Sequence, residues 1–240
     1  MKSMLRLLLL SFLYFSPIAL QAQNVLHTDL SLKYLTKEPA VKSGQSPVII
    51  LLHGFGSNEA DLFDLKDAFP KEFIVVSARA PMAIGPNAYQ WFANKQIKGS
   101  TEGDKADLKQ SRNKIKAFIE EITREYHADP SQVYLCGFSQ GAMMSYEVGL
   151  TAPELLRGIA PLSGKIFSSL KPDIKKSASL NHLKVFIGHG DADNRVDPAF
   201  ATSANAYLKK LGLSPSLHFY KGMSHSISDV EIADLAKWLH

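Results

Sequence analysis

Cysteine is almost absent from this sequence of 240 residues, which contains only Cys136. One cysteine cannot form a disulfide within the chain, so the folded protein must be held together by its hydrophobic core. Cys136 stands inside an apolar run, and we therefore expect a buried packing residue and not a nucleophile.

Dense positive charge is also absent. The formal net charge is +4, and lysine and arginine are scattered along the chain, not interleaved with aromatic residues in a stripe. This pattern argues against nucleic acid as a partner. No internal repeat and no low-complexity linker divides the chain, so we expect one domain of ordinary size.

Long hydrophobic runs are missing as well. The N-terminal apolar stretch, residues 7–15, is shorter than the roughly 20 residues that a membrane-spanning helix requires. Lys2 and Arg6 precede this stretch, while Pro17 and the small residue Ala22 follow it. This layout is typical of a secretory signal peptide that is cleaved after the small residue.

The predicted organisation is therefore a cleaved signal peptide, residues 1–22, and one domain, residues 23–240. The alternative is an uncleaved membrane anchor, which the short and interrupted apolar stretch disfavours. No cysteine follows that stretch, so a lipoprotein-type attachment has no residue to use. We expect an exported protein, periplasmic or extracellular, without a stable membrane anchor. The sequence leaves the oligomeric state open.

Short apolar runs rich in β-branched residues alternate with helix-like stretches along the rest of the chain. Such alternation predicts βαβ units, and hence a three-layer α/β fold with a mostly parallel central sheet. The first run alternates like a half-exposed strand, and several others are nearly continuous, as in buried parallel strands. The runs are residues 30–35, 47–53, 73–78, 133–138, 158–163, 183–189 and 217–221.

Helical periodicity is clearest over residues 108–126, where apolar residues recur on one face and charged residues on the other. Asn58, Asp197 before Pro198, and Ser228 are expected to begin helices. Residues 79–103, which contain several glycines and prolines, are expected to be the one long irregular connection. Long loops in compact domains often serve as lids or binding loops.

One pentapeptide carries chemistry. Gly137-Phe-Ser139-Gln-Gly141 follows an apolar run and precedes helix-forming residues. The sequence G-x-S-x-G in this context predicts a nucleophile elbow, a strained turn that presents the serine hydroxyl above the carboxyl edge of a sheet. The pentapeptide alone is also compatible with an ordinary strand-to-helix turn.

Three other predicted strands end in residues suited to assist a nucleophilic serine. The segments are residues 53–57, 188–197 and 222–226, and ligands in open sheets bind at such carboxyl ends. A serine nucleophile needs a base, an acid that orients the base, and two N–H donors for the developing oxyanion. The chain supplies candidates for each of these roles in the order Ser, Asp, His.

This order resembles the α/β-hydrolase superfamily. More closely, LLHGFGSNEADL, SARAPMAIGPNAYQWF, VYLCGFSQGAMM, HGDADNRVD and GMSHSIS resemble the bacterial phospholipase and carboxylesterase family that includes the acyl-protein thioesterases. The resemblance runs from about Pro47 to His240. It departs at Ala142, where a second glycine is expected, but that position lies inside the predicted helix.

The resemblance implies a role for each residue of the site. Ser139 matches the nucleophile, His225 the base and Asp193 the acid. The backbone N–H groups of Phe55 and Gln140 match the donors of the oxyanion hole. No cofactor and no metal are implied, and the substrate is an ester of a small molecule, lipid or other acyl group.

The aspartates of residues 188–197 can also be compared with one another. Asp197 precedes a proline and is expected to cap the following helix. Asp191 follows a glycine at the strand end and is expected to shape the turn. Asp193 is left in the middle of the loop, free to reach His225.

Other residues near the predicted site have less specific readings. Trp91 either anchors the core or lines an acyl pocket, and the sequence leaves both open. His53 is expected to shape the oxyanion loop through hydrogen bonds. Ser163 is expected to pack or hydrogen-bond near the site. A metal at His189-Gly-Asp-Ala-Asp193 is disfavoured, since neighbouring residues of one loop rarely converge on one ion.

The sequence thus predicts a secreted serine carboxylesterase or thioesterase with a Ser-His-Asp acyl-enzyme mechanism. A lysophospholipase and an esterase acting on acylated polysaccharide are alternatives within the same chemistry. A non-catalytic hydrolase-fold module that only binds an acyl group is the alternative outside it. Export would separate the protein from cytosolic acyl-cysteine and so weakens the protein-thioesterase reading.

Overall fold

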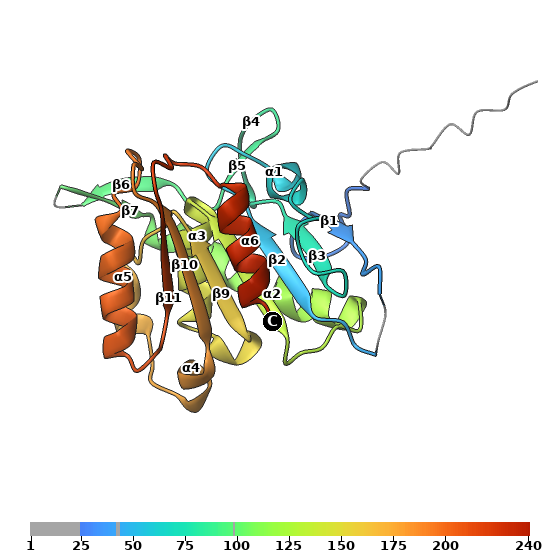
Figure 1. Cartoon of the computed structure of the whole chain (residues 1–240). Coiled ribbons are helices and arrows are strands. Elements are labelled where there is room, and N and C mark those ends of the chain that lie inside the picture. Colours follow the sequence, from blue (N-terminus) through green and yellow to red (C-terminus); the bar gives the residue numbers. More distant parts are fainter. Residues whose placement is uncertain (1–24, 42–43, 98) are drawn as a thin grey trace, which may run out of the picture.

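The structure is a computed structural model that describes residues 25–41, 44–97 and 99–240 (Figure 1). The predicted signal peptide, residues 1–22, lies outside the described residues. A seven-stranded sheet runs through the molecule in the order β1-β3-β2-β8-β9-β10-β11. Only β1 is antiparallel to its neighbour, and every other adjacent pair is parallel. The strands are β1 (Tyr34–Lys37), β2 (Val48–Leu52), β3 (Ile74–Ala78), β8 (Val133–Phe138), β9 (Gly158–Leu162), β10 (Lys184–Gly190) and β11 (Ser216–Tyr220).

Helices cover both faces of the sheet, so the predicted three-layer α/β fold is confirmed. α2 (Lys105–Glu125), α3 (Gln140–Gly149), α4 (Ala178–His182) and α5 (Ala199–Lys210) pack on one face. α1 (Glu59–Phe63) and α6 (Asp229–Trp238) pack on the other, and α6 crosses the front of the sheet in Figure 1.

The central strands are hydrophobic throughout because both of their faces are covered. Along β2, Ile50 and Leu52 pack against the α2 and α3 side, whereas Ile49 and Leu51 pack against the α1 and α6 side. All five residues of β2 are buried. Continuous apolar runs are the pattern expected of parallel strands in such a sheet.

Six of the seven predicted strands lie within two residues of the observed ones. The first does not, because residues 29–32 form bends and β1 begins only at Tyr34. The bends turn the chain so that His27 and Tyr34 exchange backbone hydrogen bonds of 2.9 and 3.1 Å. The strand is therefore displaced toward the C-terminus from the predicted residues 30–35.

The expectation of one irregular connection over residues 79–103 is wrong. This segment contains two β-hairpins, one formed by β4 (Met82–Gly85) and β5 (Ala88–Gln90), the other by β6 (Asn94–Ile97) and β7 (Ser100–Gly103). Their strands are short and largely exposed, so they lack the apolar pattern that marks the central strands.

The three predicted helix starts are confirmed by capping hydrogen bonds. The side chain of Asn58 accepts the Ala60 N–H, that of Asp197 accepts the Ala199 N–H, and that of Ser228 accepts the Glu231 N–H. Each bond satisfies a backbone donor that has no partner inside its helix.

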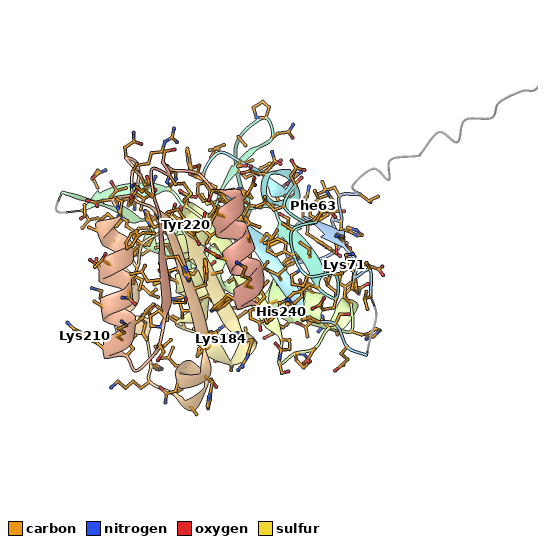
Figure 2. The ribbon with its side chains drawn as sticks, viewed as in Figure 1. Phe63, Lys71, Lys184, Lys210, Tyr220 and His240 are labelled. Carbon is orange, nitrogen blue, oxygen red and sulfur yellow. The ribbon has the colours of Figure 1, made fainter. Side chains whose placement is uncertain are left out.

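The carboxyl ends of the parallel strands share one edge of the sheet. Figure 2 shows Lys184, at the start of β10, below Tyr220, at the end of β11. Both β-hairpins of residues 82–103 also lie toward that upper edge (Figure 1). Among the described residues, no helix is both long enough and apolar enough to cross a membrane.

Candidate active site

Ser139 sits in a strained turn between β8 and α3. Its backbone has φ 55° and ψ −113°, a left-handed conformation that is rare for a residue with a side chain. A Cβ atom on Gly137 would lie 2.1 Å from the carbonyl oxygen of Gly141, and one on Gly141 would lie 1.9 Å from that of Leu52. Only glycine fits at either position, and the predicted nucleophile elbow has the expected geometry.

The elbow directs the Ser139 hydroxyl toward His225, which lies in the loop after β11. Ser139 Oγ is 2.9 Å from His225 Nε2, and His225 Nδ1 is 2.7 Å from Asp193 Oδ2. The ring of His225 also packs against the ring of Phe138, with centroids 4.9 Å apart. Three strand ends, those of β8, β10 and β11, thus bring the predicted Ser, Asp and His into one hydrogen-bonded chain.

Asp193 is fixed at both carboxylate oxygens. Its Oδ1 accepts the backbone N–H groups of Arg195 at 2.8 Å and Val196 at 2.9 Å, which leaves Oδ2 for His225. Burial alone would raise the pKa of Asp193, but the hydrogen bonds from His225 and the two N–H groups outweigh it and hold the pKa below its ordinary value. The aspartate therefore remains a carboxylate at neutral pH.

The other two aspartates of this loop have the separate roles that the sequence suggested. Asp191 Oδ1 accepts the N–H of Gly222 at 2.6 Å and so ties the end of β10 to the turn after β11. Asp197 caps α5 through the Ala199 N–H. Neither has a hydrogen bond to His225 among the described residues.

His53 shapes the loop that carries Phe55, as predicted. Its Nε2 accepts the N–H of Ala80 at 3.0 Å, so the proton lies on Nδ1, which donates to the carbonyl oxygen of Gly54 at 2.7 Å. Burial lowers the pKa of His53 and keeps this ring neutral. A Cβ atom on Gly54 would lie 3.5 Å from that of Ser139, so the loop passes directly beside Ser139.

Trp91 serves as a core anchor and is not among the residues that line the pocket beside Ser139. Its side chain is fully buried, and its indole N–H donates to the carbonyl oxygen of His53 at 2.9 Å. The backbone N–H of Trp91 donates to the side chain of Gln140, whose amide in turn donates to the carbonyl oxygen of Phe92. The prediction that Trp91 lines an acyl pocket is therefore wrong. The side chain instead supports the backbone of His53, two residues before Phe55.

Two backbone N–H groups beside Ser139 are free to bind an anion. Within the described part of the chain, neither Phe55 N–H nor Gln140 N–H donates to an acceptor. Gln140 is the first residue of α3, where the helix dipole also favours negative charge. The side-chain bonds of Gln140 to Trp91 and Phe92 hold this amide in place. These side-chain bonds were not predicted, because the sequence motif assigns a role only to the backbone N–H of Gln140.

Comparison with known proteins agrees with this geometry. The family model described as Phospholipase/Carboxylesterase matches residues 37–240. This chain belongs to the phospholipase/carboxylesterase family. It is therefore a hydrolase of carboxylic ester or thioester bonds.

Named relatives illustrate the family. The chain is 31% identical to acyl-protein thioesterase 1 of Kluyveromyces lactis, over 80% of this chain and 90% of that protein. Among solved structures, esterase PE8 is 29% identical with a TM-score of 0.72, covering 85% of this chain and 95% of that one. A carboxylesterase from Mesorhizobium loti, 21% identical, shares the fold with a TM-score of 0.77 over 90% of this chain and 98% of that one.

A pocket of about 440 Å³ opens beside Ser139 in this phospholipase/carboxylesterase family member. The β6–β7 hairpin, which belongs to the segment where the sequence suggested a lid or binding loop, contributes to the wall of this pocket. Three lining residues, Lys165, Arg195 and Phe200, were not predicted, although Lys165 and Arg195 follow the carboxyl ends of β9 and β10. The lining residues are Gly54, Phe55, Asn94, Gly99, Ser100, Thr101, Phe138, Ser139, Gln140, Met143, Lys165, Phe167, Arg195, Val196, Phe200 and His225.

Three residues near the site have structural roles. Ser163, at the end of β9, also has a positive φ of 51°, but it is fully buried and its hydroxyl has no partner among the described residues. Cys136 is buried in β8, as predicted, and burial raises the pKa of its thiol. His189 Nε2 donates to the carbonyl oxygen of Val196 at 2.9 Å and lies 3.3 Å from Asp193 Oδ2, which helps to shape the loop that carries Asp193.

Proposed function

We propose that this protein is an exported serine carboxylesterase that forms an acyl-enzyme on Ser139. The observation that carries the proposal is the pair of hydrogen bonds from Ser139 Oγ to His225 Nε2, 2.9 Å, and from His225 Nδ1 to Asp193 Oδ2, 2.7 Å. A base in contact with the nucleophile and an acid in contact with the base are the requirements for nucleophilic acyl transfer.

The reaction proceeds in two steps. In the first, Ser139 Oγ attacks the carbonyl carbon while His225 Nε2 takes the hydroxyl proton. His225 then donates this proton to the leaving alcohol or thiol. In the second, a water molecule loses a proton to His225 and attacks the acyl-enzyme, which releases the carboxylic acid and restores Ser139. The ionised Asp193 stabilises the imidazolium that forms in both steps.

The tetrahedral intermediate places its oxyanion on the N–H groups of Phe55 and Gln140. These amides have no competing acceptor within the described residues, and Gln140 stands at the N-terminus of α3. Donors that are already in position lower the activation barrier because no reorganisation is needed when the charge develops.

The continuous proton path favours catalysis over a non-catalytic acyl-binding module. A module that only binds would not require a strained serine within hydrogen-bonding distance of a histidine. Carboxylic esters are the proposed substrates, and a thioester is open to the same attack. A lysophospholipid or an acylated polysaccharide remains the second candidate, supported by the predicted export of the chain.

Turnover of neutral 4-nitrophenyl esters of increasing acyl length tests the proposal. The wild-type protein should hydrolyse the series with a preferred chain length, and Ser139→Ala should remove the activity without unfolding the protein. Ser163→Ala is the matched control, because this serine also has a positive φ at the end of a neighbouring strand. Hydrolysis that survives Ser139→Ala would contradict the assigned nucleophile.

Mass spectrometry of the protein purified from cells that produce it tests export. The proposal predicts a chain that begins at Gln23, since the signal peptide is removed after the small residue Ala22. An intact N-terminus that begins at Met1 in a membrane fraction would contradict cleavage and favour an anchor.

A further inference from the structure

The pocket beside Ser139 contains a lysine, Lys165, that forms no salt bridge with any of the described residues. Lys165 follows Gly164, which packs so closely on α3 that a Cβ atom there would lie 2.5 Å from the Cβ atom of Ala142. Its side chain lines the pocket, and its Nζ donates to the carbonyl oxygen of Thr101 on the β6–β7 hairpin. No carboxylate of the described residues lies within 4.0 Å of this ammonium group.

Two aromatic rings stabilise the positive charge of Lys165. Its Nζ lies 5.3 Å from the ring centroid of Phe167 and 4.9 Å from that of Phe200, and both rings also line the pocket. The faces of aromatic rings attract an ammonium group electrostatically. The carboxylate of Glu102 interacts electrostatically with Lys165 at longer range. It accepts the backbone N–H of Ser168 and does not line the pocket.

Arg195 adds a second positive charge at the same pocket. Its backbone N–H is held by Asp193 Oδ1, so the residue lies next to the acid that orients His225. Its side chain is exposed and has no carboxylate partner among the described residues. The pocket lining contains these two basic side chains and no aspartate or glutamate.

We propose that the pocket selects esters that carry a negatively charged group, a carboxylate or phosphate, within reach of Lys165 and Arg195. This inference rests on the proposed esterase function and names the substrate class of that site. Attraction between opposite charges in a partly buried pocket is much stronger than in water. The same charges repel a cationic substituent, so quaternary-ammonium esters should be poor substrates. The anionic group only positions the ester, and the bonds that break and form are those of the hydrolysis described above.

Two matched pairs of esters locate the anionic group. In the first pair the acyl chain differs, with mono-4-nitrophenyl adipate compared with 4-nitrophenyl hexanoate. In the second the leaving group differs, with 4-acetoxybenzoate compared with 4-acetoxybenzamide. For each pair we define the anion preference as the ratio of kcat/KM for the charged ester to that for the neutral one, after subtraction of spontaneous hydrolysis.

The wild-type protein should show an anion preference in at least one pair, and the pair that shows it identifies the side of the ester. Lys165→Met and Arg195→Gln should each lower this preference by roughly tenfold, the order expected for one charge pair that solvent screens in part. Lys165→Arg should restore it because the charge is kept. Lys171→Met is the matched control, since its Nζ also lies over a ring, that of Tyr207 at 5.0 Å, but outside this pocket.

A wild-type preference for the neutral ester in both pairs would overturn the inference. An anion preference that folded Lys165→Met and Arg195→Gln proteins both retain would overturn it as well. Neither result would affect the proposed function, which fails separately if no neutral ester is hydrolysed or if Ser139→Ala remains active.

Discussion

At the scale of single residues, the three aspartates of the loop after β10 show how position determines role. Asp191, Asp193 and Asp197 lie within seven residues of one another, so spacing alone could not assign the acid. In the structure each carboxylate has a different partner: a turn N–H, the imidazole of His225 and a helix N-terminus. Only Asp193 combines burial with contact to His225.

The first prediction replaces the carboxylate of Asp193 by an amide. The oxygen of that amide could still accept both backbone N–H groups, but its NH₂ would face His225 Nδ1. The proton of the imidazole would then lie on Nε2, which could no longer accept one from Ser139. Asp193→Asn should therefore lower kcat by about 10⁴-fold, as the same change does in serine proteases. We expect little change in the melting temperature.

Asp197 provides the control for this measurement. Asp197→Asn should alter neither turnover nor melting temperature, because asparagine caps helices about as well as aspartate. Asp197→Ala should lower the free energy of unfolding by about 1 kcal/mol and leave turnover intact. An active Asp193→Asn protein together with an inactive, folded Asp197→Asn protein would mean that the acid is misassigned.

The second prediction concerns the oxyanion donor at residue 55. Proline has no N–H, so Phe55→Pro should lower kcat by roughly 10²- to 10³-fold, the usual effect of losing one such donor. Phe55→Leu keeps the N–H and should have a much smaller effect on kcat. Steady-state kinetics of both variants, each shown to be folded by circular dichroism, would separate the backbone from the side chain. Equal losses would place the donor elsewhere.

At the scale of secondary-structure elements, the strands and the elbow could be predicted and the hairpins could not. Buried parallel strands are continuously apolar, and the elbow requires glycine on each side of Ser139, so both leave clear sequence patterns. β6 reads Asn-Lys-Gln-Ile and is exposed at all four positions, so no hydrophobic pattern distinguishes it from a loop. The two basic side chains of the pocket were not predicted, because Lys165 belongs to no motif and Arg195 has no assigned role within HGDADNRVD. The two residues line one pocket only in the folded chain.

The third prediction tests the packing of the elbow. In Gly141→Ala the new methyl group would lie 1.9 Å from the carbonyl oxygen of Leu52, a backbone atom that cannot move without shifting β2. We expect a loss of more than about 3 kcal/mol in the free energy of unfolding, the upper range for overpacked sites. Urea denaturation measures this loss.

Gly85→Ala is the matched control. A Cβ atom at that position would meet the Cβ atom of Ala88 at 3.7 Å, an ordinary contact. Its free energy of unfolding should stay within about 1 kcal/mol of the wild-type value. A Gly141→Ala protein as stable as this control would contradict the close approach of strand and helix at the elbow.

At the scale of the whole molecule, the site is assembled at one edge of the sheet from segments that are distant in sequence. The sheet face that α1 and α6 cover holds a second feature, the buried carboxyl group of Glu231 on α6. This side chain is fully buried, and a Cβ atom on Gly188 of β10 would lie 2.1 Å from its Oε1. Neither carboxyl oxygen has a hydrogen-bond partner among the described residues.

The fourth prediction follows from the titration of this group. Burial raises the pKa of Glu231 to about 8, from an ordinary value of 4.5. Between these values the folded state holds a proton that the unfolded state has lost, so stability decreases as pH rises through this window. Glu231→Gln does not titrate. The free energy of unfolding of Glu231→Gln minus that of the wild type should therefore increase by more than ~1 kcal/mol as the pH rises from about 5 to about 8.

Urea denaturation at several pH values measures this difference. Glu147, whose pKa burial raises to about 7, is present in both proteins and cancels in the comparison. Glu120→Gln, on the exposed face of α2, should follow the wild-type pH dependence. Parallel stability curves for wild type and Glu231→Gln would contradict the buried, unpartnered carboxyl.

The central claim is that Ser139 is a nucleophile activated by His225, and reaction with a fluorophosphonate probe tests it most directly. Such probes modify serines that a neighbouring base activates. Peptide mapping of the labelled wild-type protein should place the probe on Ser139 alone, Ser163→Ala should be labelled equally, and Ser139→Ala should not be labelled. A folded wild-type protein that fails to react, or a label that persists in Ser139→Ala, would contradict the account.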